Sequence, residues 1–206
     1  MAESSRSHLT MTRSPSIAVP EEQTGWLVRH ALQAHQSDTA KVYVICLEGS
    51  RSVVGYYALA AGAIEHAAAP PRPTKGVGRY RVPVVILTRL GVDLAQQGRG
   101  LGSALVRDAL FQVASIAERV GVRALLIHAE TPEAAAFYQG IDPGFEPSPT
   151  DPLHVILLIK DLRRAIHDAA AAQPMTTNSP RGSCRTTRRS LTDRARLGAE
   201  FGAAVL

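Results

Sequence analysis

The sequence is poor in the features that mark several large protein classes. Its 206 residues include only two cysteines, Cys46 in an apolar run and Cys184 in a polar one. Two isolated cysteines suggest neither a disulfide framework nor a zinc site, and we expect no bound metal. No apolar run approaches the roughly 18 residues of a membrane span, and the first 20 residues lack the apolar core of a secretory signal. These absences predict a cytoplasmic protein that does not bind membranes.

A net positive charge is almost absent outside one segment. The chain carries a net charge of +5, but from Gln173 onward six arginines stand against two acidic residues, which is +4. The rest of the chain is nearly neutral. The basic character therefore belongs mostly to the tail and does not by itself make the remaining chain a nucleic-acid binder.

Composition divides the chain into three regions. Residues 1–20 are rich in serine and aperiodic, and we expect them to be disordered. Residues 21–170 alternate apolar periodic segments with turn residues and are predicted to form one folded domain. Residues 171–206 are rich in Ser, Thr and Arg and are predicted to be a disordered basic tail.

Apolar spacing within the domain predicts a mixed α/β fold. Helices are expected over residues 23–36, from Leu101 to a C-cap at Gly121, from Thr131-Pro132-Glu133 to about Gly140, and after residue 160. Strands are expected in KVYVICLEG, SVVGYYALAAG, VPVVILTRLGVD, VRALLIHAE and HVILLIK, with a turn at residues 48–51 and a Pro/Gly loop over residues 69–81.

The hexapeptide QGRGLG, residues 97–102, joins a predicted strand to a predicted helix. Unpaired backbone N–H groups at such a helix start bind phosphate readily. A Walker A loop is excluded because no Lys follows Gly102, and the spacing G-x-G-x-G does not match the Rossmann G-x-G-x-x-G. Glycines that only permit tight packing stay an alternative for the hexapeptide alone.

The same hexapeptide matches the pattern Q/R-x-x-G-x-G/A, and the chain thereby resembles the GNAT family of N-acetyltransferases. LTRLGVD before the loop, LLIHAE and AAAFYQGIDPGF after it resemble family segments in the family order, so the resemblance covers about residues 25–163. It implies the GNAT fold, a mixed central sheet with splayed strands flanked by helices. It also implies acetyl-CoA as cosubstrate.

The resemblance implies a role for each part of this segment. Backbone groups of Leu90 and Val92 are expected to contact pantetheine, with the Val92 N–H polarising the thioester carbonyl. Tyr138 is the expected general acid for the departing thiolate, with Phe137 filling the core in its place. The pyrophosphate is expected on N–H groups of the loop, namely Gln97, Gly98, Arg99, Gly100, Gly102 and Ser103.

VVGYYALAAG and QGRGLGSALVRDAL also resemble the acetyltransferase toxins of toxin–antitoxin pairs, which acetylate the α-amine of aminoacyl-tRNA. This narrower resemblance implies an aminoacyl-tRNA substrate, a ribbon-helix-helix antitoxin and a homodimer. Basic residues could form a rim that holds the RNA backbone. The candidates are Arg29, Arg72, Lys75, Arg79, Arg81 and Arg89.

Other interpretations stay open at this stage. The protein could acetylate small amines or protein N-termini, or it could be an inert antitoxin-binding partner, and the basic residues could belong to a solvated loop. His30, His128 and His154 are expected to be packing or surface residues, because their spacing makes no metal site.

Overall fold

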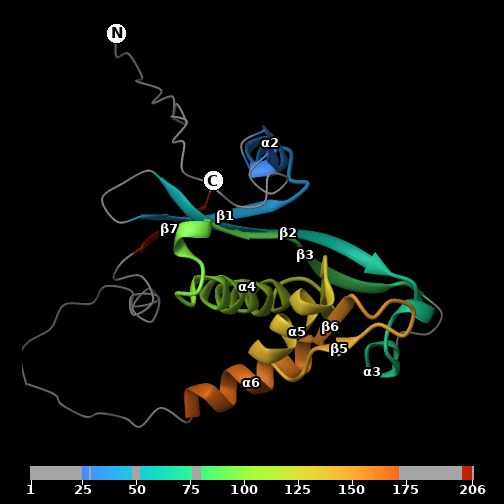
Figure 1. Cartoon of the computed structure of the whole chain (residues 1–206). Helices are drawn as coiled ribbons and strands as arrows, with labels where there is room; N and C mark the ends of the chain where they lie inside the picture. Colours follow the sequence, from blue (N-terminus) through green and yellow to red (C-terminus); the bar gives the residue numbers. More distant parts are fainter. Residues whose placement is uncertain (1–24, 28, 48–51, 76–79, 172–200, 206) are drawn as a thin grey trace, which may run out of the picture.

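A seven-stranded mixed sheet forms the centre of the computed structural model, which describes residues 25–27, 29–47, 52–75, 80–171 and 201–205 (Figure 1). The strand order is β5-β6-β4-β3-β2-β1-β7. Among the described strand pairs only β3 and β4 run parallel. The strands are β1 (Lys41–Leu47), β2 (Val53–Ile64), β3 (Val82–Val92), β4 (Ala124–His128), β5 (Glu146–Pro147), β6 (His154–Leu158) and β7 (Phe201–Val205).

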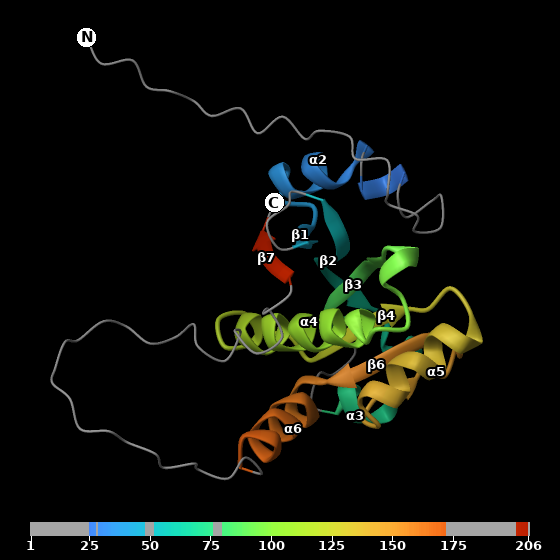
Figure 2. The same ribbon diagram turned by 60° about the vertical axis from the view of Figure 1, so that its left-hand side comes forward.

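Helices cover both faces of this sheet. Three helices, α4 (Leu101–Ala117), α5 (Pro132–Ile141) and α6 (Ile159–Ala171), lie on one side, and α2 (Ala31–Gln36) lies on the other (Figures 1 and 2). The periodic apolar stripe of α4 explains its place, since Leu105, Ala109 and Val113 are all fully buried against the sheet. The mixed α/β fold expected from the sequence is confirmed.

Local sequence signals account for the start of α5. The Thr131 hydroxyl oxygen accepts a hydrogen bond from the N–H of Ala134 (3.2 Å), Pro132 occupies the first helical position, and Glu133 lies in the first turn. The end of α4 differs from the prediction. The helix stops at Ala117 with Glu118 as its cap, before Gly121.

Three other expectations need correction. Residues 69–81, expected to be a loop throughout, contain the one-turn helix α3 (Pro71–Thr74). The helix expected over residues 23–36 is interrupted at His30, because residues 25–27 and 29 are helical before it and α2 starts at Ala31 after it. Residues 201–205 were expected in a disordered tail, yet β7 pairs antiparallel with β1, from Tyr43 opposite Val205 to Leu47 opposite Phe201. The turn at residues 48–51 and most of the two predicted disordered ends lie outside the described residues.

Candidate functional site

The parallel strands β3 and β4 separate part-way along their length. They pair only from Val84 opposite Ala124 to Leu87 opposite Ile127. At the same point β3 has a bulge, because its register on β2 skips Thr88, whose hydroxyl donates to the carbonyl of Ala58 (3.3 Å). Because a bulge bends its strand, β3 turns away from β4 at Thr88, and the two strands no longer pair beyond that residue.

A cleft of about 1060 Å³ opens where the strands part. Its walls come from β3, β4, α5 and residues 97–102 (the glycine loop), together with Trp26 and with Ala34 of α2. The expected residues Leu90, Val92, Gln97, Gly98, Gly100, Gly102, Ser103, Arg89 and Tyr138 all line this cleft, together with Thr88, His128, Glu130 and Phe137. The structure thus brings together most residues that the sequence singled out.

The backbone of β3 presents two residues to the cleft. The N–H of Asp93 donates to the carbonyl of Val54 on β2 (2.9 Å). Because hydrogen bonding alternates along an antiparallel pair, Gly91 also faces β2, while the N–H and C=O groups of Leu90 and Val92 face the side from which β4 has departed. This orientation fits the pantetheine contacts expected at these two residues.

The loop after β3 is shaped by two glycines in the left-handed region. Gly98 has φ +73° and Gly100 has φ +82°, conformations that disfavour other residues. The N–H of Ala104 donates to the carbonyl of Gly100 (3.0 Å). The N–H groups of residues 101–103 therefore precede the first internal hydrogen bond of α4 and are available to a bound anion.

Gln97 has a different role from the expected one. Its N–H already donates to the carbonyl of Leu94 (3.3 Å), and its side-chain amide donates to the carbonyl of Val92 (3.2 Å). Gln97 therefore ties the loop to the end of β3. Arg99 is not among the lining residues of the cleft, and its guanidinium donates to the side chain of Gln96 (2.5 Å).

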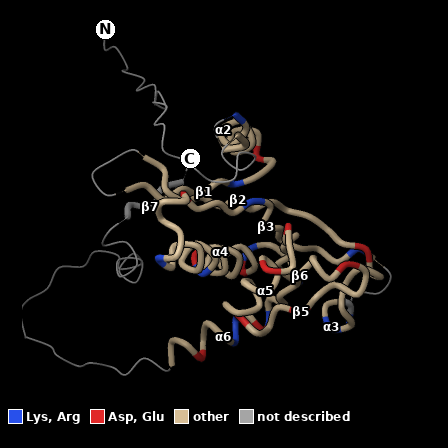
Figure 3. Tube along the Cα trace, viewed as in Figure 1, with Lys and Arg blue, Asp and Glu red and all other residues tan. Residues whose placement is uncertain are grey.

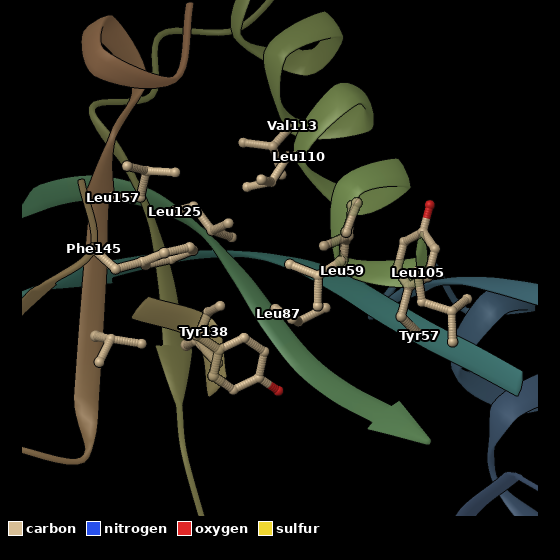
Figure 4. Packing of buried hydrophobic residues seen from close by; sticks show 14 of the residues in the cluster. Tyr57, Leu59, Leu87, Leu105, Leu110, Val113, Leu125, Tyr138, Phe145 and Leu157 are labelled. Atoms are coloured by element: carbon tan, nitrogen blue, oxygen red, sulfur yellow. The ribbon is translucent and has the colours of Figure 1, made fainter. Parts of the chain in front are cut away.

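Tyr138 and Phe137 both line the cleft, but Tyr138 fills the core position that was expected for Phe137. Tyr138 is only 9% exposed and belongs to the main core cluster, whereas Phe137 is 38% exposed. The Tyr138 hydroxyl points away from Phe145 and Leu125 (Figure 4). No residue in the described part of the chain forms a hydrogen bond with it. Burial raises the pKa of Tyr138 to about 12, with a smaller contribution from the charge of Glu130, so the phenol keeps its proton at neutral pH.

The basic residues do not form one rim. Arg89 lines the cleft with its guanidinium 5.9 Å from the ring centre of Trp26, and the exposed Arg29 lies on the same first helical segment as Trp26. Arg72 lies on α3, near the opposite end of β3 (Figures 1 and 3). It forms ion pairs with Glu146 and Asp161, each at 2.7 Å.

Lys75 and Arg81 are also absent from the residues that line the cleft. Arg81 pairs with Glu65 (2.5 Å), and the backbone carbonyl of Lys75 accepts a hydrogen bond from Arg123 (2.7 Å). Arg79 lies outside the described residues. Sequence spacing grouped these residues because they are close along the chain, but the 11-residue β3 separates their segment from the glycine loop by roughly 30 Å.

Two negative findings concern only the residues described. They contain no group of three or more His, Cys, Asp or Glu side chains arranged to hold a metal ion. No helix within the described ranges has the length and apolar character needed to cross a membrane.

Comparisons with known proteins agree with this geometry. Residues 11–141 match the acetyltransferase (GNAT) family. The chain is 48% identical to a tRNA-acetylating toxin of Mycobacterium tuberculosis over 143 residues, 69% of this chain and 83% of that protein. The solved structure of AtaT complexed with acetyl-methionyl-tRNAfMet superposes with a TM-score of 0.64 at 28% identity, covering 71% and 86% of the two chains. A mutant AtaT bound to acetyl-CoA and to the C-terminus of the antitoxin AtaR gives 0.59 at 27% identity, covering 71% and 85%.

Proposed function

The chain belongs to the acetyltransferase (GNAT) family and is an N-acetyltransferase, and we propose that it acetylates the α-amine of aminoacyl-tRNA. In this proposal it is the toxin of a toxin–antitoxin pair and stops translation. The cleft between the separated strands is the observation that supports acetyl-CoA as the acetyl donor, because the cleft ends at the start of α4, where backbone N–H groups are available. The 48% identity to a tRNA-acetylating toxin supports aminoacyl-tRNA as the acceptor.

Acetyl-CoA would lie along the cleft with its pyrophosphate on the glycine loop. The backbone of Leu90 and Val92 would hold pantetheine, and the Val92 N–H would polarise the thioester carbonyl. The pyrophosphate would bind N–H groups of Gly98, Arg99, Gly100, Gly102 and Ser103. The cradle fits, because a Cβ on Gly98 or Gly100 would meet nothing within 4 Å, so open space lies beside both residues.

Tyr138 would donate the proton that the departing thiolate needs. A phenol with a pKa of about 12 is fully protonated at neutral pH, and its unpartnered hydroxyl lines the cleft. The acceptor amine is less demanding, because an α-amine with a pKa near 8 is about one-tenth neutral at pH 7.

Arg89 and Arg29 are the proposed contacts to the RNA backbone. Arg89 is fixed over the Trp26 ring at the cleft, so its charge would meet the acceptor end of the tRNA. Arg72 and Arg81 are assigned to ion pairs instead. A ribbon-helix-helix antitoxin, a homodimer and a cytoplasmic location belong to the proposal through the resemblance to the toxins.

The test supplies labelled acetyl-CoA with charged tRNA, uncharged tRNA and free amino acids in parallel. We expect label only on charged tRNA, lost when the aminoacyl ester is hydrolysed, with transfer falling as salt rises. Label on free amino acids or on peptide N-termini, indifferent to salt, would favour an acetyltransferase for small amines or proteins.

A further inference from the structure

His128 occupies a special point in the sheet. It is the first residue of β4 beyond the last pair with β3, which joins Leu87 to Ile127. On its other side it is paired with His154 of β6. Its side chain lines the cleft described above, at the position where the two parallel strands begin to separate.

His128 and Tyr138 approach the cleft from opposite faces of the sheet. Side chains alternate along β4: Leu125 and Ile127 pack in the core cluster that contains Tyr138, whereas Ala124 and Leu126 pack in the cluster on the other face. His128 therefore belongs to the face opposite Tyr138. A reacting carbonyl in the gap between β3 and β4 would have a phenol on one side and an imidazole on the other.

Stacking holds the imidazole of His128 and leaves its nitrogens available. Its ring lies 4.0 Å from that of His154, with 21° between the planes. The Nε2 of His154 lies 3.4 Å from a carboxylate oxygen of Asp151. Within the described ranges no residue forms a hydrogen bond with either nitrogen of His128.

The surroundings of His128 favour its neutral form. Burial lowers its pKa, the neighbouring His154 lowers it further, and Asp151 opposes them with a smaller effect. Glu130 and Arg89 also line the cleft. Glu65 lines a second cavity, of about 200 Å³, together with His128 and His154. A neutral imidazole can accept a proton at neutral pH.

We propose that His128 is the general base of the acetyl transfer, an inference that rests on the proposed function. As the substrate nitrogen bonds to the acetyl carbonyl carbon, the nitrogen loses a proton to the imidazole of His128. The carbon–sulfur bond breaks, and Tyr138 gives its phenolic proton to the departing sulfur. The imidazolium then loses its proton to water, and the tyrosinate regains one from water.

The test is chemical rescue of His128→Ala with imidazole at pH 7.5. We expect kcat to fall by about 100-fold, since general base catalysis contributes 10²–10⁴-fold, with KM for acetyl-CoA unchanged. Added imidazole should restore at least tenfold of the lost rate, in proportion to its unprotonated fraction. His154→Ala is the matched control: it removes the stacking partner, and we expect a loss of less than fivefold that imidazole does not restore.

A wild-type rate in His128→Ala, or a loss that imidazole leaves unchanged in a folded protein, would overturn the inference. His128→Gln is the second variant, in case the alanine variant fails to fold, and it should show the same loss in kcat at an unchanged melting temperature. If the wild type labels only low-molecular-weight α-amino esters, the proposed function fails. The same variants assayed on such an ester still decide the role of His128.

Discussion

Replacing either of two buried tyrosines, Tyr138 or Tyr57, by Phe should affect turnover in one case and stability in the other. Tyr138 lines the cleft and its hydroxyl has no hydrogen-bond partner among the described residues. Tyr57 is 1% exposed on β2, stacks on Tyr43 and donates its hydroxyl proton to the carboxylate of Asp108 on α4. Replacing either tyrosine by Phe removes one oxygen and keeps the ring that packs in the core (Figure 4).

The magnitudes follow from these partners. Tyr138→Phe loses no protein hydrogen bond, so we expect the free energy of unfolding to change by less than about 0.5 kcal/mol. Its turnover should fall by about 100-fold, which corresponds to about 2.7 kcal/mol in the barrier. Tyr57→Phe removes the hydrogen bond from the Tyr57 hydroxyl to the Asp108 carboxylate, which should cost about 1.5 kcal/mol. That loss lowers the melting temperature by roughly 3–6 °C in a domain of this size.

Both variants are measured for turnover on charged tRNA, for acetyl-CoA affinity by calorimetry and for melting temperature. We expect Tyr138→Phe to lose kcat at normal affinity and stability, and Tyr57→Phe to lose stability at normal kcat below its melting range. Wild-type turnover by Tyr138→Phe would refute the assignment of the acid. A comparable loss of kcat in Tyr57→Phe would mean that the effect comes from core packing and not from the donated proton.

Three further predictions follow from single contacts. Gly100→Ala should strain the left-handed backbone by about 1 kcal/mol and weaken acetyl-CoA binding more than tenfold in calorimetry. Gly121→Ala is the control and should do neither, because Gly121 has open space beside it and no positive φ. Equal affinities in the two variants would remove the phosphate-loop assignment. Arg72→Ala should lower the midpoint of urea unfolding, because it removes a partner of the nearly buried Asp161, while KM for charged tRNA stays unchanged; a raised KM would return Arg72 to the RNA contacts. Because the pKa of Tyr138 is raised from 10 to about 12, its contribution to the free energy of unfolding is complete below pH 10 and falls by about 2.7 kcal/mol as pH rises to 12; urea titrations should show a smaller alkaline loss in Tyr138→Phe than in the wild type.

The sequence by itself determined the order of the longer helices and strands up to α6 and the location of the proposed phosphate-binding loop. These features have local causes: the apolar stripe of α4, the Thr131 cap of α5, and glycines at residues 98 and 100 that permit a positive φ. The resemblance to the GNAT family pointed to Leu90 and Val92, and alternation along β3 explains why their backbone groups face the same side. Each of these properties depends on residues only a few positions apart.

The tertiary structure decided everything that depends on contacts between distant segments. Helical spacing placed Phe137 and Tyr138 on different faces but could not say which face would be buried, because that depends on how α5 docks on the sheet. Arg72 and Arg89 are 17 positions apart in the sequence, yet most of β3 lies between them, and Arg72 forms ion pairs with Glu146 and Asp161 much further along the chain.

The pairing of His128 with His154 shows the same limit. Twenty-six positions separate the two residues, and only the antiparallel register of β4 and β6 stacks their rings. The position of His128 at the cleft depends in turn on the Thr88 bulge, where β3 turns away from β4. Periodicity in a sequence reports the environment along one element, whereas the register and separation of strands arise from the packing of the whole sheet.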